Sequence, residues 1–437
     1  MRARLLLVAA VAASLAGCAT ASTSVPAGSQ ASASPAASAP SATAASSSAA
    51  AASATPSPTG TAAGRPAPPS PSGSSGPGCG TPPSPFLDAN ELTGVEFVSP
   101  SRGWAVGQGA ILATTDGGAH WKAQLTGTLN LTSVDLINEE DGWAVGVDSL
   151  LATTDGGAHW TPLAEPCPLI RSVHFTSAAD GYAVAGGNVT SVGGFGSEIP
   201  DLGGTVLVTH DGGHTWARMT TPANAQTVCF SGARGGWLGA NGRLYRTRDG
   251  GRSWTAVTSP PATNQGGYIA SMSVQCAGPD AAWAVRSGPG AGMSQQPHVA
   301  YHADASGVTA IYAEQYYRLS GDPATSSPGA YSGPFSALSP SSAVFIDSCS
   351  PCNAGTAPWA VAASSGTTLA EQGNVGGINF ANAAAFLSPQ AGWVAGVFME
   401  LPAKGKSRYQ QRIVATTDGG KTWQTEWASP WTNSLQQ

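Results

Sequence analysis

The motif Asp-Gly-Gly-x-x-Trp recurs five times in this 437-residue chain. A repeat at this spacing constrains the architecture more than any single residue does, because it implies that one small structural unit is copied along the chain. The first two copies lie 39 residues apart, and the third and fourth lie 38 residues apart. The five copies begin and end at Asp116 and Trp121, Asp155 and Trp160, Asp211 and Trp216, Asp249 and Trp254, and Asp418 and Trp423.

A second element, Gly-Trp-Ala-Val-Gly or a variant of it, stands upstream of the motif, as at 103–107 and 142–146. Between residues 131 and 165 the chain alternates four short apolar runs with polar or glycine-rich turns. Short runs rich in Val, Leu, Ile and Trp, bounded by Gly, Asp and Asn, are typical of β-strands. Each unit is therefore predicted to hold four strands, here named A to D in chain order.

The Asp-Gly-Gly motif is predicted to form the tight turn between strands C and D. An aspartate carboxylate can accept hydrogen bonds from backbone N–H groups further along a turn, and glycine adopts positive φ without steric cost. The tryptophan then opens strand D with a large apolar face. A calcium loop needs several carboxylates at fixed offsets, whereas each motif supplies one. We therefore interpret these Asp and Trp residues as structural and expect no metal site.

These motifs resemble the Asp-box, or BNR, repeat of the β-propellers in sialidases, some xyloglucan-cleaving glycosidases and sorting receptors. Combined with Gly-Trp-Ala-Val-Gly, they also resemble the photosystem II assembly/stability factor family, whose members are single propellers. The resemblance covers roughly residues 91–427. It implies a propeller fold but little about function, because Asp-boxes lie at blade peripheries in those families.

The fold prediction is all-β: a single β-propeller of seven four-stranded blades that follows a disordered N-terminal tether. Strong units start near residues 95, 134, 173 and 228, and a weaker one with a decayed motif starts near 274. A sixth unit lacks the motif, and the last spans about 378–427. Six or eight blades would also fit the spacing. Radially arranged sheets of this kind leave only short, protected strand edges.

The N-terminal 85 residues predict export and membrane anchoring. Two arginines, an apolar run at 5–15 and Leu-Ala-Gly-Cys ending at Cys18 describe a secretory signal that resembles a bacterial lipobox, so we expect Cys18 to be lipidated. Residues 19–85 are almost entirely Ala, Ser, Pro, Thr and Gly, which predicts a disordered tether. The expected domains are thus residues 1–18, 19–85 and the propeller at 86–430. The expected location is the extracytoplasmic side of the cell membrane.

Six further cysteines predict disulfide bonds, since an even number is typical of exported chains. Two of them occupy near-equivalent innermost-strand positions in consecutive units and are expected to pair. The candidate pairs are Cys229 with Cys276, Cys349 with Cys352, and Cys79 with Cys167. The Cys-Ser-Pro-Cys spacing at 349–352 is also found in thioredoxin-like motifs, but no βαβ pattern accompanies it.

Several function classes are disfavoured by composition and spacing. A net charge of −6 with only four lysines provides no basic stripe for nucleic acid. His210 with His214 and His298 with His302 have an i, i+4 spacing, but strand geometry separates such pairs by roughly 13 Å, too far for one metal. No Gly-x-Ser-x-Gly elbow occurs in the propeller, and no sialidase-like arginine motif precedes the first box. No cofactor is expected.

The positions of the insertions predict a binding surface. They fall between strands B and C, at 186–204, 287–297, 348–358 and 398–411. In a propeller these connections share one face, opposite the Asp-box turns, and variable loops on a rigid scaffold commonly carry binding. The last insertion holds the candidate binding residues Lys404, Lys406, Arg408 and Tyr409.

The functional prediction is a surface-anchored lipoprotein whose propeller is a non-catalytic scaffold for an envelope or membrane protein. The alternative is a propeller that binds or hydrolyses carbohydrate, as sialidases do. No nucleic-acid partner is expected, and a glycan ligand remains the alternative to a protein partner.

Overall fold

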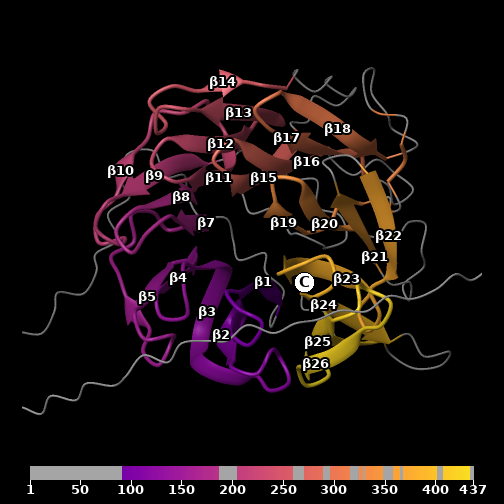
Figure 1. Ribbon diagram of the computed structural model, residues 1–437. Coiled ribbons are helices and arrows are strands. Elements are labelled where there is room, and N and C mark those ends of the chain that lie inside the picture. The colour runs from indigo at the N-terminus through magenta and orange to yellow at the C-terminus, as the bar shows by residue number, and fades with distance from the viewer. Residues whose placement is uncertain are drawn as a thin grey trace, which may run out of the picture. The chain divides into compact units, whose positions relative to one another are not determined.

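The computed structural model describes residues 91–186, 204–258, 270–288, 296–314, 331–347, 358–364, 368–400 and 407–433, together with 323, 325–327 and 329. Every regular element among them is a β-strand, as the all-β prediction requires (Figure 1). The described residues contain no helix long and apolar enough to cross a membrane. Cys18, the tether, Cys79, Cys349, Cys352, Lys404 and Lys406 lie outside the described residues.

The described strands form six antiparallel sheets that follow one another in chain order. The first contains β1 (Leu92–Phe97), β2 (Gly103–Thr114), β3 (Lys122–Leu136), β4 (Gly142–Val147), β5 (Ser149–Thr153) and β6 (Thr161–Pro162). The second contains β7 (Ile170–Phe175), β8 (Gly181–Ala185), β9 (Thr205–Thr209) and β10 (Ala217–Arg218). The third contains β11 (Ala225–Ser231), β12 (Gly235–Ala240), β13 (Arg243–Thr247) and β14 (Thr255–Ala256).

The remaining three sheets also have four strands each. The fourth contains β15 (Ser271–Gly278), β16 (Ala281–Ser287), β17 (His298–Ala303) and β18 (Val308–Ala313). The fifth contains β19 (Phe335–Ser339), β20 (Ser342–Asp347), β21 (Trp359–Ser364) and β22 (Thr368–Asn374). The sixth contains β23 (Phe380–Phe386), β24 (Gly392–Glu400), β25 (Arg408–Thr416) and β26 (Gln424–Ala428).

The prediction of seven separate blades is therefore wrong, because the structure has six sheets. The difference lies in the first sheet, which holds the first two repeat units. Strand β3 pairs with β2 through Lys122–Thr126 and with β4 through Asn130–Leu136. It thus serves as strand D of one unit and strand A of the next without a break, and it merges the two units into one six-stranded sheet.

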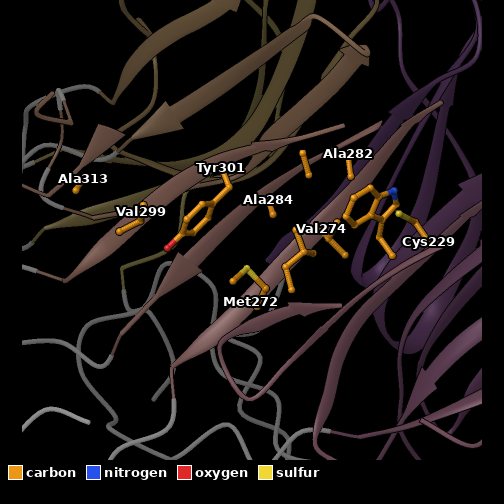
Figure 2. Close-up of a cluster of buried hydrophobic side chains, with 11 residues drawn as sticks. Cys229, Met272, Val274, Ala282, Ala284, Val299, Tyr301 and Ala313 are labelled. Carbon is orange, nitrogen blue, oxygen red and sulfur yellow. The ribbon is translucent and has the colours of Figure 1, made fainter. Parts of the chain in front are cut away.

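Consecutive repeat units pack face to face through buried hydrophobic side chains. The cluster between the fourth and fifth units includes Trp237 on one side and Met272, Val274 and Tyr301 on the other (Figure 2). The last sheet packs in the same way against the first: Trp393 lies on Phe97 with ring centroids 3.5 Å apart. The sheets therefore close into a ring, with the yellow β24–β26 beside the indigo β1 and β2 in Figure 1.

The Gly-Trp-Ala-Val-Gly element is explained by two close contacts. A Cβ on its first glycine, Gly103, would lie 2.5 Å from the ring of Phe97, which covers the glycine from strand A. A Cβ on its last glycine, Gly146 in the second unit, would overlap the carbonyl oxygen of Asn130. Where strand A offers a small side chain instead, as at Cys276 and Ala337, the paired residue is alanine (Ala282 and Ala343). The size of the two partners is thus matched within each unit.

One position of the innermost strand links each of the first six units to the next. It is the strand A residue paired with the Trp, Tyr or Val of strand B. The Glu96 carboxylate accepts a hydrogen bond from Leu136 N at 2.9 Å, and the Asp135 carboxylate accepts one from Phe175 N at 2.7 Å. At the same position, His174 Nε2 donates a hydrogen bond to Phe230 O, and Gln275 Nε2 donates one to Phe335 O. Ser336 Oγ accepts a hydrogen bond from Phe386 N. We call these contacts the inner links.

The inner link between the fourth and fifth units is covalent. Cys229 occupies the linking position and forms a disulfide with Cys276, with a Cα–Cα distance of 5.7 Å, which confirms this predicted pair. Cys167 is also disulfide-bonded, but its predicted partner Cys79 lies outside the described residues, as does the Cys349–Cys352 pair. Those two pairings stay predictions.

Candidate functional site

The five Asp-boxes share one hydrogen-bond pattern. In the second unit, Asp155 Oδ1 accepts from Thr153 Oγ1 and from His159 N, both at 2.9 Å. Thr153 Oγ1 in turn accepts from Gly157 N at 2.8 Å. The His159 side chain, whose Nδ1 lies 2.6 Å from Asp155 Oδ2, lowers the pKa of Asp155 most. Together with the bonds from His159 N and Thr153 Oγ1 it brings this pKa to about 2. Equivalent bonds surround Asp116, Asp211, Asp249 and Asp418, so each carboxylate is engaged by its own turn.

The box glycines hold neighbouring parts of the ring together. Gly156 N donates to Glu140 O at 2.9 Å, which joins the C–D turn to the A–B turn of the same unit. Box carbonyls also accept from the tryptophans of the preceding unit in the ring: Trp143 Nε1 donates to Gly212 O, and Trp393 Nε1 donates to Gly117 O, each at 2.9 Å. The latter bond helps to close the ring. The geometry therefore assigns these turns a structural role.

The two histidines of the first i, i+4 pair contact different partners. His210 Nδ1 lies 2.7 Å from Asp180 Oδ1, whereas His214 Nδ1 donates to Asp211 O. Within the described ranges no group of three His, Cys, Asp or Glu side chains is placed to hold a metal ion.

A buried Ser-His-Asp cluster lies between the fifth and sixth units. His298 Nδ1 donates to Gln296 O, and His298 Nε2 lies at hydrogen-bond distance from Ser327 Oγ, each at 2.9 Å. Ser327 Oγ donates to Asp347 Oδ2 at 2.6 Å. Burial alone would lower the pKa of His298, but the Asp347 carboxylate more than offsets this and raises it.

This arrangement does not match a hydrolytic triad. A triad needs the aspartate on Nδ1 and a serine whose proton passes to Nε2. Here Nδ1 faces a carbonyl, the aspartate lies on the Nε2 side at 3.8 Å, and His298 and Asp347 are only 2% exposed. We interpret the cluster as a buried ion pair bridged by Ser327, which holds adjacent connections in place.

The last unit carries the largest projection in the described part of the chain. Strands β24 and β25 have nine residues each, against five to seven for most B and C strands. Their outer ends pair as far as Glu400 with Arg408. Beyond β26 the chain continues in the same direction along β25, where Tyr409 and Thr432 exchange backbone hydrogen bonds of 2.8 and 2.9 Å. We call this three-stranded projection, residues 397–400, 408–411 and 430–433, the terminal flap.

Aromatic rings and guanidinium groups alternate on one face of the terminal flap. The Arg408 guanidinium lies 4.4 Å from the ring centre of Trp431, and Arg408 Nε donates to Glu400 Oε2 at 2.6 Å. At the base of the flap the Arg412 guanidinium lies 3.7 Å from the ring centre of Phe398. Trp431 is 38% exposed, and only Leu387 among the other described large hydrophobic residues is as exposed.

The structure places two of the four residues of the predicted binding loop. Arg408 and Tyr409 lie on the terminal flap, whereas Lys404 and Lys406 fall outside the described residues. Sequence reasoning missed Trp431, Phe398 and Arg412. The available signal was the tryptophan in Pro-Trp-Thr at 430–432, which follows the last strand and belongs to no Asp-box.

Residues 87–169 match the family described as "Photosynthesis system II assembly factor YCF48". The chain is an Asp-box β-propeller that resembles this family. The match covers the first two repeat units, which are also the pair merged into one sheet. A search of curated proteins found no match.

Among solved structures, the chain is similar to one described as YCF48 bound to D1 peptide, at 16% identity over 72% of this chain and 95% of that chain (TM-score 0.46). It is also similar to YCF48 from Cyanidioschyzon merolae, at 17% identity over 68% and 84% of the two chains (TM-score 0.41). An ancestral GH74 enzyme matches at 14% identity over 78% of this chain and 54% of its own (TM-score 0.47). Similarities this low do not carry over a partner or an activity.

Proposed function

We propose that this chain is a non-catalytic scaffold that binds a protein of the cell envelope through the terminal flap. The observation that carries the proposal is Trp431, a large exposed ring that lies under the Arg408 guanidinium. Exposed aromatic and arginine side chains on a rigid support are the residue types that most often dominate protein–protein binding energy. The match of residues 87–169 to a family described as an assembly factor supports the same reading.

The proposed location follows from the N-terminal sequence. A lipid on Cys18 would hold the chain at the membrane, and the 19–85 segment would let the propeller move away from the bilayer surface. A partner that belongs to the envelope or the membrane itself would then lie within reach.

The absence of an enzymatic role is also part of the proposal. The described polar clusters are engaged in structure: the box carboxylates fix turns, and His298 and Asp347 form a buried pair. The alternative of a carbohydrate-cleaving propeller is not favoured by the distant GH74 likeness. The box tryptophans, which could have formed a sugar platform, are partly buried between units.

The test is capture of a partner from detergent-solubilised envelopes with the full chain, followed by a binding titration with the purified partner. Trp431→Ala and Arg408→Glu should each weaken binding by about 10-fold or more, as expected for central interface residues. The matched controls are Leu387→Ala, which removes an equally exposed side chain, and Lys421→Glu, which reverses a charge at the box end of the same unit. Both controls should bind like the parent.

Two results would contradict the proposal. One is a partner whose affinity falls equally in the flap and the control variants. The other is saturable glycan binding or hydrolysis by the purified chain that Trp431→Ala abolishes, which would move the function to carbohydrate.

A further inference from the structure

The fourth repeat unit carries a cluster of arginines at its turn end. Arg234 lies in the turn between β11 and β12, and Arg248 and Arg252 lie in the Asp-box turn between β13 and β14. All three side chains are exposed. Gly250 N donates to Arg234 O at 3.0 Å, which fixes the two turns against each other. The three arginines are therefore held together on a rigid pair of turns.

The repeat itself shows that the fold does not require these arginines. The other four boxes keep the same threonine, aspartate and glycine hydrogen bonds with different residues at the three positions. Arg234 corresponds to Ser101, Glu140, Ala179 and Gln390; Arg248 to Thr115, Thr154, His210 and Thr417; and Arg252 to Ala119, Ala158, His214 and Lys421. Among these five units only the fourth has a cation at all three positions. We therefore infer that binding, and not folding, explains the three arginines.

The cluster keeps a positive charge, because its three arginines outnumber the one carboxylate in the same turns, that of Asp249. Among the described residues none of the three arginines forms an ion pair, and Asp249 is engaged by Thr247 and Ser253 within the box. Asp280, in the next unit, pairs with Arg246. Burial and the neighbouring Arg248 guanidinium lower the pKa of Arg246, so these two arginines repel each other. An anion would relieve this repulsion.

We propose that Arg234, Arg248 and Arg252 dock the propeller on the phosphate groups of an anionic lipid surface. The planar guanidinium matches phosphate geometry, and arginines at the tips of adjacent turns can meet a flat surface together. The choice of a lipid rests on the membrane location proposed above. Because the chain as a whole has a net charge of −6, attraction to an anionic membrane would have to come from these locally positive turns.

Docking in this way would orient the protein. The arginine cluster lies at the Asp-box end of its unit, whereas the terminal flap lies at the B–C end of the last unit. Along β25 these ends, Arg408 and Thr416, are separated by about 25 Å. With the box end on the membrane, the flap faces away from it and is free to bind a partner.

The test is sedimentation of the full chain with phosphatidylcholine vesicles, with and without phosphatidylglycerol. Cys18→Ser is included in every sample, so that no acyl chain contributes. Each arginine near an anionic surface contributes about a fivefold factor, so Arg234→Gln/Arg248→Gln/Arg252→Gln should weaken binding by about 100-fold. Binding should also weaken at high salt. Thermal unfolding checks that the variants fold.

The matched control compares two double variants that each remove two charges. Arg248→Gln/Arg252→Gln should weaken vesicle binding, whereas Lys404→Gln/Lys406→Gln, in the B–C insertion of the last unit, should not. The proposal is wrong if the parent chain ignores phosphatidylglycerol or if both doubles lose affinity equally. It is also wrong if the parent binds an acidic polypeptide but no vesicle. None of these outcomes depends on the terminal flap, so they are distinct from a failure of the proposed function.

Discussion

Removal of the disulfide between Cys229 and Cys276 should destabilise the propeller more than the loss of any other inner link. The bond joins residues 47 apart in the chain. By the chain-entropy relation, a closed loop of this length restricts the unfolded state by about 4 kcal/mol at 25 °C. The double variant Cys229→Ala/Cys276→Ala should therefore lower the free energy of unfolding by about that amount.

Differential scanning calorimetry gives the most direct measurement. A domain of this size unfolds with an entropy of about 0.7 kcal/mol/K, so the melting temperature should fall by roughly 5 °C. Substitution is preferable to a reducing agent, because reduction would also open the disulfide of Cys167.

The control is Ser336→Ala, at the same position of the sixth unit. Its hydroxyl accepts from Phe386 N at 3.1 Å, and loss of one neutral hydrogen bond should cost about 1 kcal/mol. The reasoning is refuted if the double cysteine variant melts at the parent's temperature, or no lower than Ser336→Ala does.

Two further predictions concern the junctions between units. Trp393→Phe should lower the free energy of unfolding by about 1 kcal/mol more than Trp104→Phe does, as measured by thermal or denaturant unfolding. The reason is that the Trp393 indole N–H donates to Gly117 O, whereas the Trp104 indole N–H has no hydrogen-bond partner among the described residues. Equal losses would show that the bond between Trp393 and Gly117 adds nothing. The second is that stability falls as pH rises above about 4.5 and above about 6.5, the ordinary pKa values of Glu and His. Burial and the neighbouring Asp135 raise the pKa of Glu96, and Asp135 also raises the pKa of His174 against the opposing effect of burial. Both groups hold protons more tightly in the folded state, so unfolding releases protons and becomes easier at high pH. If the melting temperature of Glu96→Gln changes with pH as steeply as that of the parent chain, the contribution assigned to Glu96 is wrong.

The strand order of each unit could be predicted because it depends on local chemistry. Asp155 and its glycines are a turn signal in any context, and the alternation of apolar runs with turns places the strands around it. The Cys229–Cys276 pair followed from the same alignment of units, since strand A positions in neighbouring units face each other.

The sheet count and the complete site could not be predicted in the same way. Whether strand D of the first unit stops before strand A of the second depends on backbone geometry around Gly127, where two ordinary strand sequences meet. The stacking of Trp431 on Arg408 joins the C-terminus to a hairpin more than 20 residues earlier, and no periodicity marks it. Similarly, only the folded turns show that Arg234 lies beside Arg248 and Arg252.

The contact between the first and last sheets has a consequence for how the chain folds. Leu92 N donates to Gln411 Oε1 across 319 residues, so the ring cannot close until nearly the whole propeller has left the ribosome or the export channel. Every other junction joins neighbouring units and can form as the chain emerges. Because closure entropy grows only slowly with loop length, the late step costs little stability but delays completion. Until then the faces of Phe97 and Trp393 stay open, and an incomplete chain would present them to chaperones, proteases or a second copy.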